Sequence, residues 1–446
     1  MKIRLPEHVT YILHTLEAAG FEGYAVGGCV RDALLGREPQ DWDITTNARP
    51  LQVKELFRRT IDTGLQHGTV TVMLDHIGYE VTTYRIDGEY EDGRHPKAVS
   101  FTGNLKEDLM RRDFTINAMA YNETNGLVDL FEGKEDLERG IIRCVGEPKE
   151  RFFEDALRMM RAVRFSAQLG FSIDGQTLEA VHMLADTIGR ISAERIQTEL
   201  LKTLTSAHPD AVRVFYETGL SRHFLPELDA MMQTGQKNPH HCYSVGEHTL
   251  HSLMYVEADK VLRLTMLLHD VAKPQCKTTD EAGIDHFHGH PAQGAQMARA
   301  ILRRLKLDNE TTSRVTQLIR WHDDNPPLDE RGVRRAVYRI GSAQYPDIFA
   351  VKRADILAQS DYQREEKLRY VDEYEALYTQ ILEKKQCLCI RDLAVNGADL
   401  LAEGVPQGKQ IGACLDMLLQ LVLEQPEKNT REYLLEVVRT SHSGTA

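Results

Sequence analysis

The stretch Tyr24-Ala25-Val26-Gly27-Gly28-Cys29-Val30-Arg31-Asp32 joins two apolar runs through a pair of glycines. The first run, Tyr24 to Val26, predicts a strand, and the second, Val30 to Leu35, predicts a helix. Paired glycines at such a junction let backbone N–H groups approach a phosphate closely. Arg31, at the start of the helix, can reach the same anion. The stretch therefore predicts an α/β unit that cradles a phosphate on the backbone of Gly28.

Two carboxylates follow this cradle in the sequence Asp41-Trp42-Asp43. On a strand, positions 41 and 43 point to the same face. Two adjacent anions repel each other unless a cation lies between them, so the pair predicts a Mg²⁺ site. A Gly-Gly pair alone is usually a turn, and a lone D-x-D is usually a solvated strand end. In this order and spacing, the two motifs together indicate nucleotidyl transfer.

A third carboxylate is offered by Glu80, which lies on a later predicted strand. Glu80 can complete the Mg²⁺ site, and the alternative is a strand residue that only faces solvent.

The bulk composition describes a soluble globular chain with several domains. It has 446 residues, 42% hydrophobic and 27% charged. The net charge of −13 argues against indiscriminate binding of nucleic acid, so a polynucleotide partner requires a local basic face. The chain has seven cysteines but no C-x-x-C pair, which predicts a reducing compartment. Its N-terminus lacks the apolar core of a signal peptide, and no apolar run reaches membrane-spanning length. These features together predict a cytoplasmic protein with no membrane partner.

The pattern of elements changes along the chain. Residues 68–74 and 79–84 are rich in β-branched side chains and predict paired strands. The polar segment 87–96 has two glycines and a proline, which predicts a mobile loop. From about residue 150 the periodicity is helical to the end, with breaks at Gly170, Gly219, 238–239, 326–327 and 404–406. The fold class is therefore α+β, a small α/β head followed by an all-α remainder.

Basic residues next to the head's last apolar segment are candidate triphosphate ligands. In Arg111-Arg112-Asp113, one arginine aimed inward, Arg112, can clamp a triphosphate. The alternative is an exposed arginine pair.

A helix is expected over Glu154 to Phe165, and Asp155 and Arg158 are neighbours at i, i+3 on it. Cytosine and adenine both present an exocyclic amine beside an unprotonated ring nitrogen. A carboxylate accepts from the amine and a guanidinium donates to the ring nitrogen, so one Asp–Arg pair accepts CTP and ATP and rejects uracil and guanine. The alternative is a helix salt bridge with no ligand. Arg161 and Arg164 are then phosphate ligands or supports of the helix.

A second constellation is rich in histidine. The side chains fall on successive predicted helices or their ends: His248, His269, Asp270, His290, His322 and Asp355. Histidine and aspartate together suit a divalent transition metal that activates water. Isolated histidines on helices usually serve packing, but the full ordered set predicts a metal site.

The ordered motifs resemble those of the bacterial class II CCA-adding enzymes, tRNA nucleotidyltransferases of the poly(A) polymerase superfamily. The motifs are Gly27-Gly28-x-Val30-Arg31-Asp32, Asp41-x-Asp43, Arg111-Arg112-Asp113-x-x-x-Asn117-Ala118, Glu154-Asp155-x-x-Arg158-x-x-Arg161-Ala162-x-Arg164-Phe165 and Ile191-Ser192-x-Glu194-Arg195-Ile196. The histidine set resembles an HD domain, and Val395-Asn396-Gly397-x-Asp399-Leu400 resembles the family's tRNA-binding tail. The resemblance covers nearly the whole chain.

The resemblance implies an elongated architecture in four parts. Residues 1–140 would form a nucleotidyltransferase palm head, and 141–225 a helical neck with the base-recognition helix. Residues 226–362 would form an HD-type body, and 363–446 a tRNA-binding tail. The polar loop at 86–96 resembles the family's mobile loop that helps switch from C to A.

The resemblance also implies an activity, the template-independent addition of C, C and A to the tRNA 3′ end from CTP and ATP. Mg²⁺ on Asp41 and Asp43 would activate the 3′-hydroxyl, and Gly28, Arg31 and Arg112 would hold the leaving pyrophosphate. An A-adding enzyme or a poly(A) polymerase is the alternative, because the same residues serve all three.

The resemblance to an HD domain implies a second, accessory activity. A divalent transition metal on His248, His269, Asp270 and Asp355 would make the body a phosphohydrolase acting on 2′,3′-cyclic or terminal phosphates. The alternative is a helical body that serves only as a scaffold for tRNA.

Overall fold

The computed structural model describes residues 2–87 and 99–443 and divides the chain into two compact units, Met1–Pro226 and Glu227–Ala446. The greater part of the polar loop predicted at 87–96 lies outside the described residues. The seven cysteines carry free thiols, as the sequence predicts. Within the described ranges, no helix combines the length and the apolar character that crossing a bilayer requires.

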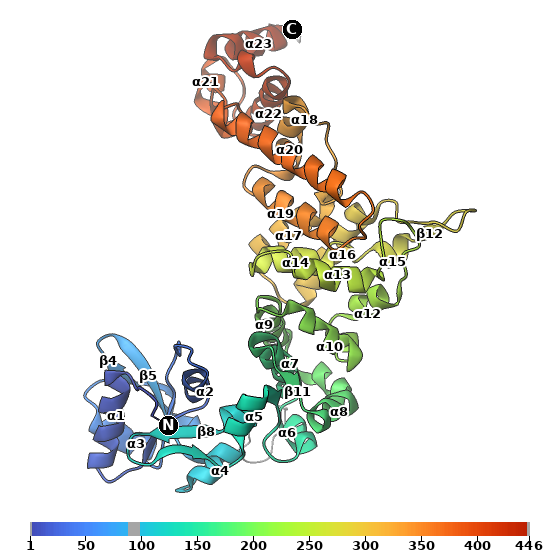
Figure 1. Ribbon diagram of the computed structural model, residues 1–446. Helices are drawn as coiled ribbons and strands as arrows, with labels where there is room; N and C mark the ends of the chain where they lie inside the picture. Colours follow the sequence, from blue (N-terminus) through green and yellow to red (C-terminus); the bar gives the residue numbers. More distant parts are fainter. Residues whose placement is uncertain (1, 88–98, 444–446) are drawn as a thin grey trace. The chain divides into compact units, whose positions relative to one another are not determined.

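The first unit is built around a seven-stranded sheet with the order β3-β4-β5-β2-β1-β8-β9 (Figure 1). Its strands are β1 (Gly23–Val26), β2 (Ile44–Thr46), β3 (Thr60–Gly64), β4 (Thr69–Leu74), β5 (Ile77–Thr83), β8 (Met119–Asn122) and β9 (Gly126–Asp129). Neighbours pair antiparallel except β2 and β5, which run parallel. The α/β head and the predicted pairing of β4 with β5 are thus confirmed.

Helices and short strands complete the head. They are α1 (Glu7–Ala18), α2 (Gly28–Leu34), α3 (Pro50–Leu56), α4 (Leu105–Met110), α5 (Gly133–Arg139) and the antiparallel pair β6 (Arg85–Asp87) and β7 (Val99–Phe101). The strand β1 is buried along its whole length, as expected for a central strand whose residues are apolar on both faces.

A helical segment follows the sheet within the first unit. Its elements are β10 (Ile141–Ile142), α6 (Pro148–Glu154), α7 (Leu157–Leu169), β11 (Ser172–Ile173), α8 (Gly175–Leu184), α9 (Ala193–Leu204), α10 (Val212–Glu217) and α11 (Ser221–Phe224). The break predicted at Gly170 is confirmed, because this glycine ends α7 at φ +73°.

One expectation about this segment is wrong. The single helix expected from Glu154 to Phe165 is interrupted at Asp155, whose backbone is extended at φ −143°, ψ 103°. The Asp155 carboxylate accepts a hydrogen bond from the N–H of Leu157 at 3.0 Å. Aspartate competes for backbone N–H groups and so favours helix ends over helix interiors. Asp155 and Arg158 are therefore not neighbours on one continuous helix.

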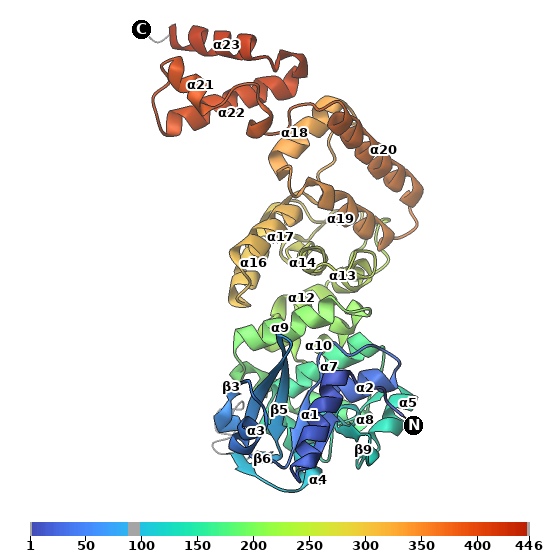
Figure 2. The same ribbon diagram turned by 90° about the vertical axis from the view of Figure 1, so that its left-hand side faces the viewer.

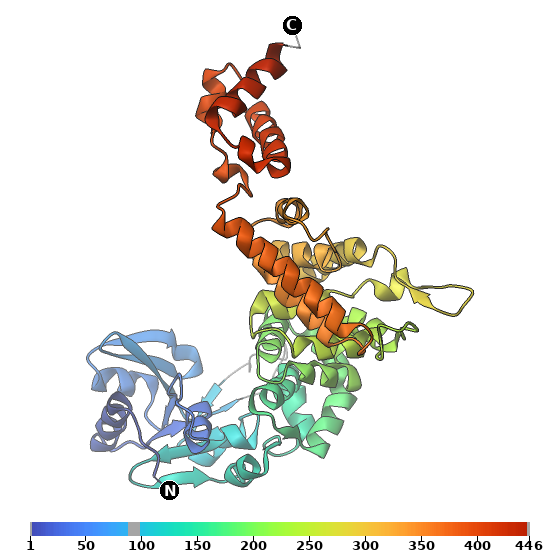
Figure 3. The ribbon, with the colours of Figure 1, turned by 45° about the horizontal axis from the view of Figure 1, so that its top comes forward.

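The second unit is helical, as predicted. Figure 2 shows the packed helices α13 (Val245–Leu253), α14 (Lys260–Leu268), α16 (His290–Arg304), α17 (Asn309–Trp321) and α19 (Tyr345–Leu357). The other helices are α12 (Pro226–Gln233), which begins at the boundary, α15 (Lys273–Cys276), α18 (Glu330–Ile340) and the 20-residue α20 (Arg364–Glu383), orange in Figure 3.

The C-terminal part of this unit has its own apolar cluster. Its helices are α21 (Gly397–Ala402), α22 (Lys409–Glu424) and α23 (Arg431–Ser443). Leu400, Leu418, Val422 and Leu434 are fully buried in it. The helix breaks predicted at 238–239, 326–327 and 404–406 fall between helices. The sequence did not predict the hairpin of β12 (Thr278–Thr279) and β13 (Asp285–His286).

The sheet and the helical segment of the first unit are joined by an ion pair whose carboxylate is buried. Arg161 of α7 donates from Nε at 2.8 Å and from Nη2 at 2.5 Å to Asp113, which follows α4. Asp113 also accepts from Asn117 Nδ2 at 3.1 Å and from the N–H of Phe114 at 2.8 Å. Burial raises the pKa of Asp113, but the Arg161 guanidinium outweighs it and holds that pKa well below its usual range.

We expect Arg161→Met to destabilise the protein by about 2 kcal/mol, because Asp113 would stay buried without its cation and Arg161 is only partly shielded from water. The ion pair stabilises the fold above the pKa of an unfolded aspartate and is lost as the pH falls toward the lower folded pKa. The difference between wild type and variant should therefore shrink below about pH 4. Urea unfolding at pH 7 and at about pH 3 measures it, and equal stability at pH 7 would contradict the assignment.

Candidate functional site

The glycine turn lies between β1 and α2, as predicted. Gly27 has φ +86°, a left-handed conformation that favours glycine. A Cβ built there would lie 2.9 Å from Nη1 of Arg112. The missing side chain thus lets the Arg112 guanidinium lie directly beside the turn.

Arg112 and Arg31 differ in how they are held. Arg112 is about one-fifth exposed, and its buried Nε has no hydrogen-bond partner in the described part of the chain. Arg31 is buried, donating to Asn117 Oδ1 at 2.7 Å and to both oxygens of Asp32. Arg112 has Asp108 as an ion-pair partner, at 3.6 Å from Nη2, and its Nη1 lies beside the turn, whereas Arg31 fixes the turn to the segment that carries Asn117.

Asp41 and Asp43 lie in extended chain immediately before β2, not within the strand. The carbonyl of Asp43 accepts from the N–H of Val26 at 3.0 Å, which holds the segment beside β1. The register pairs Ile44 with Val81, so Asp43 lies next to Glu80 on the parallel neighbour β5. All three carboxylates line one groove.

These carboxylates interact through their charges. Removal from water raises the pKa of Glu80, and the charges of Asp43 and Asp41 raise it further. Removal from water also raises the pKa of Asp43; Arg112 opposes this shift and Asp41 adds to it. Mutually repelling carboxylates with access to solvent fit a hard divalent cation, which would relieve the repulsion. Glu80 lies beside this pair, and its role as a third ligand stays a prediction.

The basic residues of α7 are engaged in structural contacts. Arg158 pairs with Glu154 at 2.6 Å and donates to the carbonyl of Arg111 at 3.0 Å. Arg164 lies 2.6 Å from the buried carboxylate of Glu199. Arg161 pairs with Asp113, so both arginines contact carboxylates of the protein itself, and whether they act as phosphate ligands or as supports of the helix stays a prediction.

Asp155 forms its ion pair with Arg195 of α9, at 2.7 Å. This contact was not predicted, because the two residues are 40 positions apart. Arg195 lies in the segment 191–196 that carries the last neck motif, which was the only signal for it in the sequence. Asp155 is only partly shielded from solvent, and Arg158 is buried, with about one-tenth of its side chain exposed.

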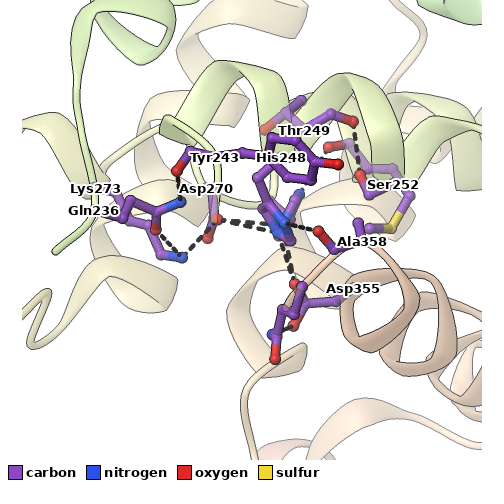
Figure 4. A network of polar contacts seen from close by, with 12 residues as sticks. Gln236, Tyr243, His248, Thr249, Ser252, Asp270, Lys273, Asp355 and Ala358 are labelled. Carbon is purple, nitrogen blue, oxygen red and sulfur yellow. Dashed lines mark hydrogen bonds and ion pairs between the residues drawn. The ribbon is translucent and has the colours of Figure 1, made fainter. Parts of the chain in front are cut away.

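The histidine-rich set converges in the second unit. The residues His248, His269, Asp270, His290, His322 and Asp355 come from α13, α14, α16, α17, α19 and their ends. Two ligand groups share Asp270: one with His248 and His269, the other with His290 and His322. Figure 4 shows His248 between Asp270 and Asp355. The sequence therefore identified side chains that the fold brings together.

Each imidazole of this cluster is oriented by its own backbone bond. Nδ1 of His269, His290 and His322 lies 2.7–2.8 Å from the carbonyl three residues earlier. Nδ1 of His248 lies 3.2 Å from the carbonyl of Ala358. A ring that donates from Nδ1 presents the lone pair of Nε2, which is the arrangement found in metal-bound histidines.

The carboxylate of Asp270 faces both groups. Oδ2 lies 3.3 Å from Nε2 of His269, and Oδ1 lies 3.4 Å from Nε2 of His290. Among the described residues, neither buried oxygen has a hydrogen-bond partner, although the Lys273 ammonium is 2.7 Å from Oδ2. Nε2 of His248 lies 2.8 Å from Asp355. Buried carboxylate and imidazole atoms in this arrangement fit divalent metal ligation.

A pocket of about 850 Å³ adjoins this cluster. Asp270, His290, His322 and Asp355 line it together with the cationic side chains of Lys273, Lys352 and Lys367. A metal bound at the cluster would therefore face a space whose lining contains lysine side chains among carboxylates.

The carboxylate groove, the glycine turn and the helical segment fixed to them define a nucleotidyltransferase of the poly(A) polymerase type. Residues 23–143 match the family model "Poly A polymerase head domain", 170–232 match "Probable RNA and SrmB- binding site of polymerase A", and 289–438 match a model for tRNA nucleotidyltransferase domain 2.

Similar proteins and solved structures show which family of nucleotidyltransferases the chain resembles. The chain is 37% identical over 432 residues to the CCA-adding enzyme of Lactiplantibacillus plantarum, covering 96% of this chain and 94% of that protein. It is 51% identical over 223 residues to that of Lactobacillus delbrueckii subsp. bulgaricus, covering 49% and 56%. The crystal structure of the Bacillus stearothermophilus CCA-adding enzyme in complex with CTP matches over 100% of both chains, with 29% identity and a TM-score of 0.70. The chain belongs to the CCA-adding enzyme family, whose members use divalent metal ions, generally Mg²⁺.

Proposed function

We propose that this chain adds C, C and A to the 3′ end of tRNA from CTP and ATP. The relatives named for this activity match nearly the whole chain, and the structure of a similar enzyme in complex with CTP supports CTP as a substrate. The observation that carries the proposal is the chain of contacts Arg161–Asp113–Asn117–Arg31, which fixes α7 to the glycine turn. These contacts fix the helix proposed to read the base relative to the turn proposed to bind the phosphates.

The proposed reaction is an in-line displacement at the α-phosphorus of the incoming nucleotide. The tRNA 3′-oxygen forms a bond to that phosphorus, and the bond to the oxygen bridging to the β-phosphate breaks, releasing pyrophosphate. Mg²⁺ held by Asp41 and Asp43, with Glu80 as third ligand, would favour loss of the 3′-hydroxyl proton and neutralise charge on the phosphate.

The turn and its arginines hold the triphosphate in this proposal. The backbone N–H of Gly28 and the guanidinium of Arg112 contact the leaving pyrophosphate. Arg31 contributes by fixing the turn and lies at its edge.

The base is read at the start of α7. Asp155 accepts from the exocyclic amine and Arg158 donates to the ring nitrogen, which suits cytosine and adenine. Arg195 orients the Asp155 carboxylate, and Glu154 orients the Arg158 guanidinium. Arg161 and Arg164 hold α7, which carries Arg158 and begins two residues after Asp155.

We keep the four-part division as part of the proposal. The head, 1–140, and the neck, 141–225, carry nucleotidyl transfer, while the body, 226–362, and the tail, 363–446, hold the acceptor half of tRNA.

Extension of a tRNA that ends at its discriminator base tests the proposal. We expect CTP alone to give a product longer by two residues, and CTP with ATP to complete CCA. An enzyme that adds only A to a tRNA ending in CC would refute full CCA addition.

Asp41→Ala should abolish incorporation of both nucleotides and leave tRNA binding nearly unchanged, because it removes a metal ligand only. Incorporation by that variant would contradict the assigned metal site.

Asp155→Ala should relax discrimination against UTP and GTP, because the acceptor for the exocyclic amine is lost. The ratio of kcat/KM for CTP to that for UTP should fall at least tenfold, which corresponds to about 1.4 kcal/mol. Glu150→Ala, exposed on α6, is the matched control. Unchanged selectivity would leave Asp155 with only its structural bond to Arg195.

A second function is proposed for the histidine cluster, metal-dependent hydrolysis of 2′,3′-cyclic or terminal phosphates. The two ligand groups that share Asp270 favour it. The bound metal would supply an activated water, Lys273 and Lys352 would attract the phosphate, and His248, His269, Asp270 and Asp355 would hold the metal.

We expect a divalent transition metal to co-purify with the wild type, and His269→Ala to lose it. His251→Ala, a histidine stacked on Tyr243 outside the ligand groups, should retain the metal. Elemental analysis of the purified proteins measures this, with thermal melting to verify folding. A wild type that binds no transition metal would leave the helical body as a tRNA scaffold.

A further inference from the structure

A groove of about 1100 Å³ opens beside the catalytic carboxylates of the first unit. Three segments line it: residues 2–6 ahead of α1, residues 36–43 between α2 and β2, and residues 77–80 of β5. Asp41, Asp43 and Glu80 belong to this lining. The groove therefore leads to the atoms at which the 3′-hydroxyl must be activated.

The same lining contains three cations, Lys2, Arg4 and Arg37. All three side chains are exposed. Across residues 2–87 and 99–443, none of them takes part in an ion pair or a side-chain hydrogen bond. The arginines of α7 differ in this respect, because Arg158 and Arg161 are paired with carboxylates. The groove thus has cations that the fold itself does not use.

The negative charge of the protein makes these cations necessary for binding RNA in this groove. The chain has a net charge of −13, and the groove contains the carboxylates that hold the metal. An RNA strand carries one negative charge per phosphate and is repelled by both. Binding a polyanion here requires unpaired cations along its path.

The groove lies apart from the residues assigned to the nucleoside triphosphate, so the triphosphate and the RNA strand would bind at different places. The triphosphate is assigned to the glycine turn and Arg112, and neither Gly27, Gly28 nor Arg112 lines the groove. The carboxylates are common to both places. The groove is therefore available for the substrate that supplies the 3′-hydroxyl.

We infer that Arg4 and Arg37 bind backbone phosphates of the RNA strand whose 3′-hydroxyl is extended, with Lys2 adding to the local positive charge. This assignment rests on the proposed nucleotidyl transfer. These contacts do not depend on the RNA sequence, because the arginines would bind phosphates and not bases. Such contacts suit an acceptor end whose last nucleotides change with each addition.

The double variant Arg4→Ala/Arg37→Ala tests the inference. We expect KM for tRNA to rise about tenfold, while kcat and KM for CTP stay within twofold of wild type. The slope of log Kd for tRNA against log salt concentration should fall by about 1.5, for two lost phosphate contacts. Arg4→Lys/Arg37→Lys should restore most of the affinity, because the charge is kept.

Arg58→Ala/Arg59→Ala is the matched control, since both residues are exposed in the same unit and lie outside the groove lining. Its salt slope should fall less than that of the groove variant. The defect should also appear on an RNA hairpin that contains only the acceptor end, because the assigned contact is next to the 3′ terminus.

Three results would overturn the inference: unchanged KM and salt slope in the groove variant, an equal loss in the control, or a defect confined to full-length tRNA. Failure of the proposed function is a separate outcome, in which the wild type itself adds neither C nor A. A wild type that extends tRNA beside an unaffected groove variant keeps the function and rejects only the phosphate contacts.

Discussion

The ion pair between the buried carboxylate of Asp113 and Arg161 is the interaction on which the site depends. Its carboxylate also accepts from Asn117, whose own carbonyl oxygen accepts from Arg31 beside the glycine turn. A rigid chain of polar contacts therefore runs from α7 to α2. Because a buried charge without its partner is costly, the helix that would read the base cannot separate from the turn that would hold the triphosphate without a large loss of stability.

Electrostatics divides the basic residues of the first unit into two groups. The arginines of α7 and α9 neutralise carboxylates and stabilise the helical segment. Within the part of the chain that the structure describes, the buried Nε of Arg112 has no hydrogen-bond partner, and Arg4 and Arg37 are unpaired in the carboxylate groove. In a chain with a net charge of −13, such cations determine where a polyanion can approach. The acidic composition and a nucleic-acid substrate are compatible because positive charge is concentrated at these points.

The histidine cluster of the second unit is organised by a repeated local device. His269, His290 and His322 each bond a carbonyl three residues earlier through Nδ1, so Nε2 points away from the local backbone. Asp270 then meets Nε2 atoms with both of its oxygens. Local backbone geometry sets the orientation of each ring, and helix packing brings the rings together.

The sequence by itself determined the α+β class, the glycine turn, the carboxylate pair and the order of the histidine ligands, because these follow from local patterns and spacings. It placed Asp155 on one helix with Arg158, where the structure has a break and an ion pair to Arg195 instead. The tertiary structure alone decided that pairing and the network around Asp113. It also decided the proximity of Glu80 to Asp43 and the position of the unpaired cations in the groove. Each joins residues far apart in the chain, and only strand register and helix packing fix which of many possible charged partners meet.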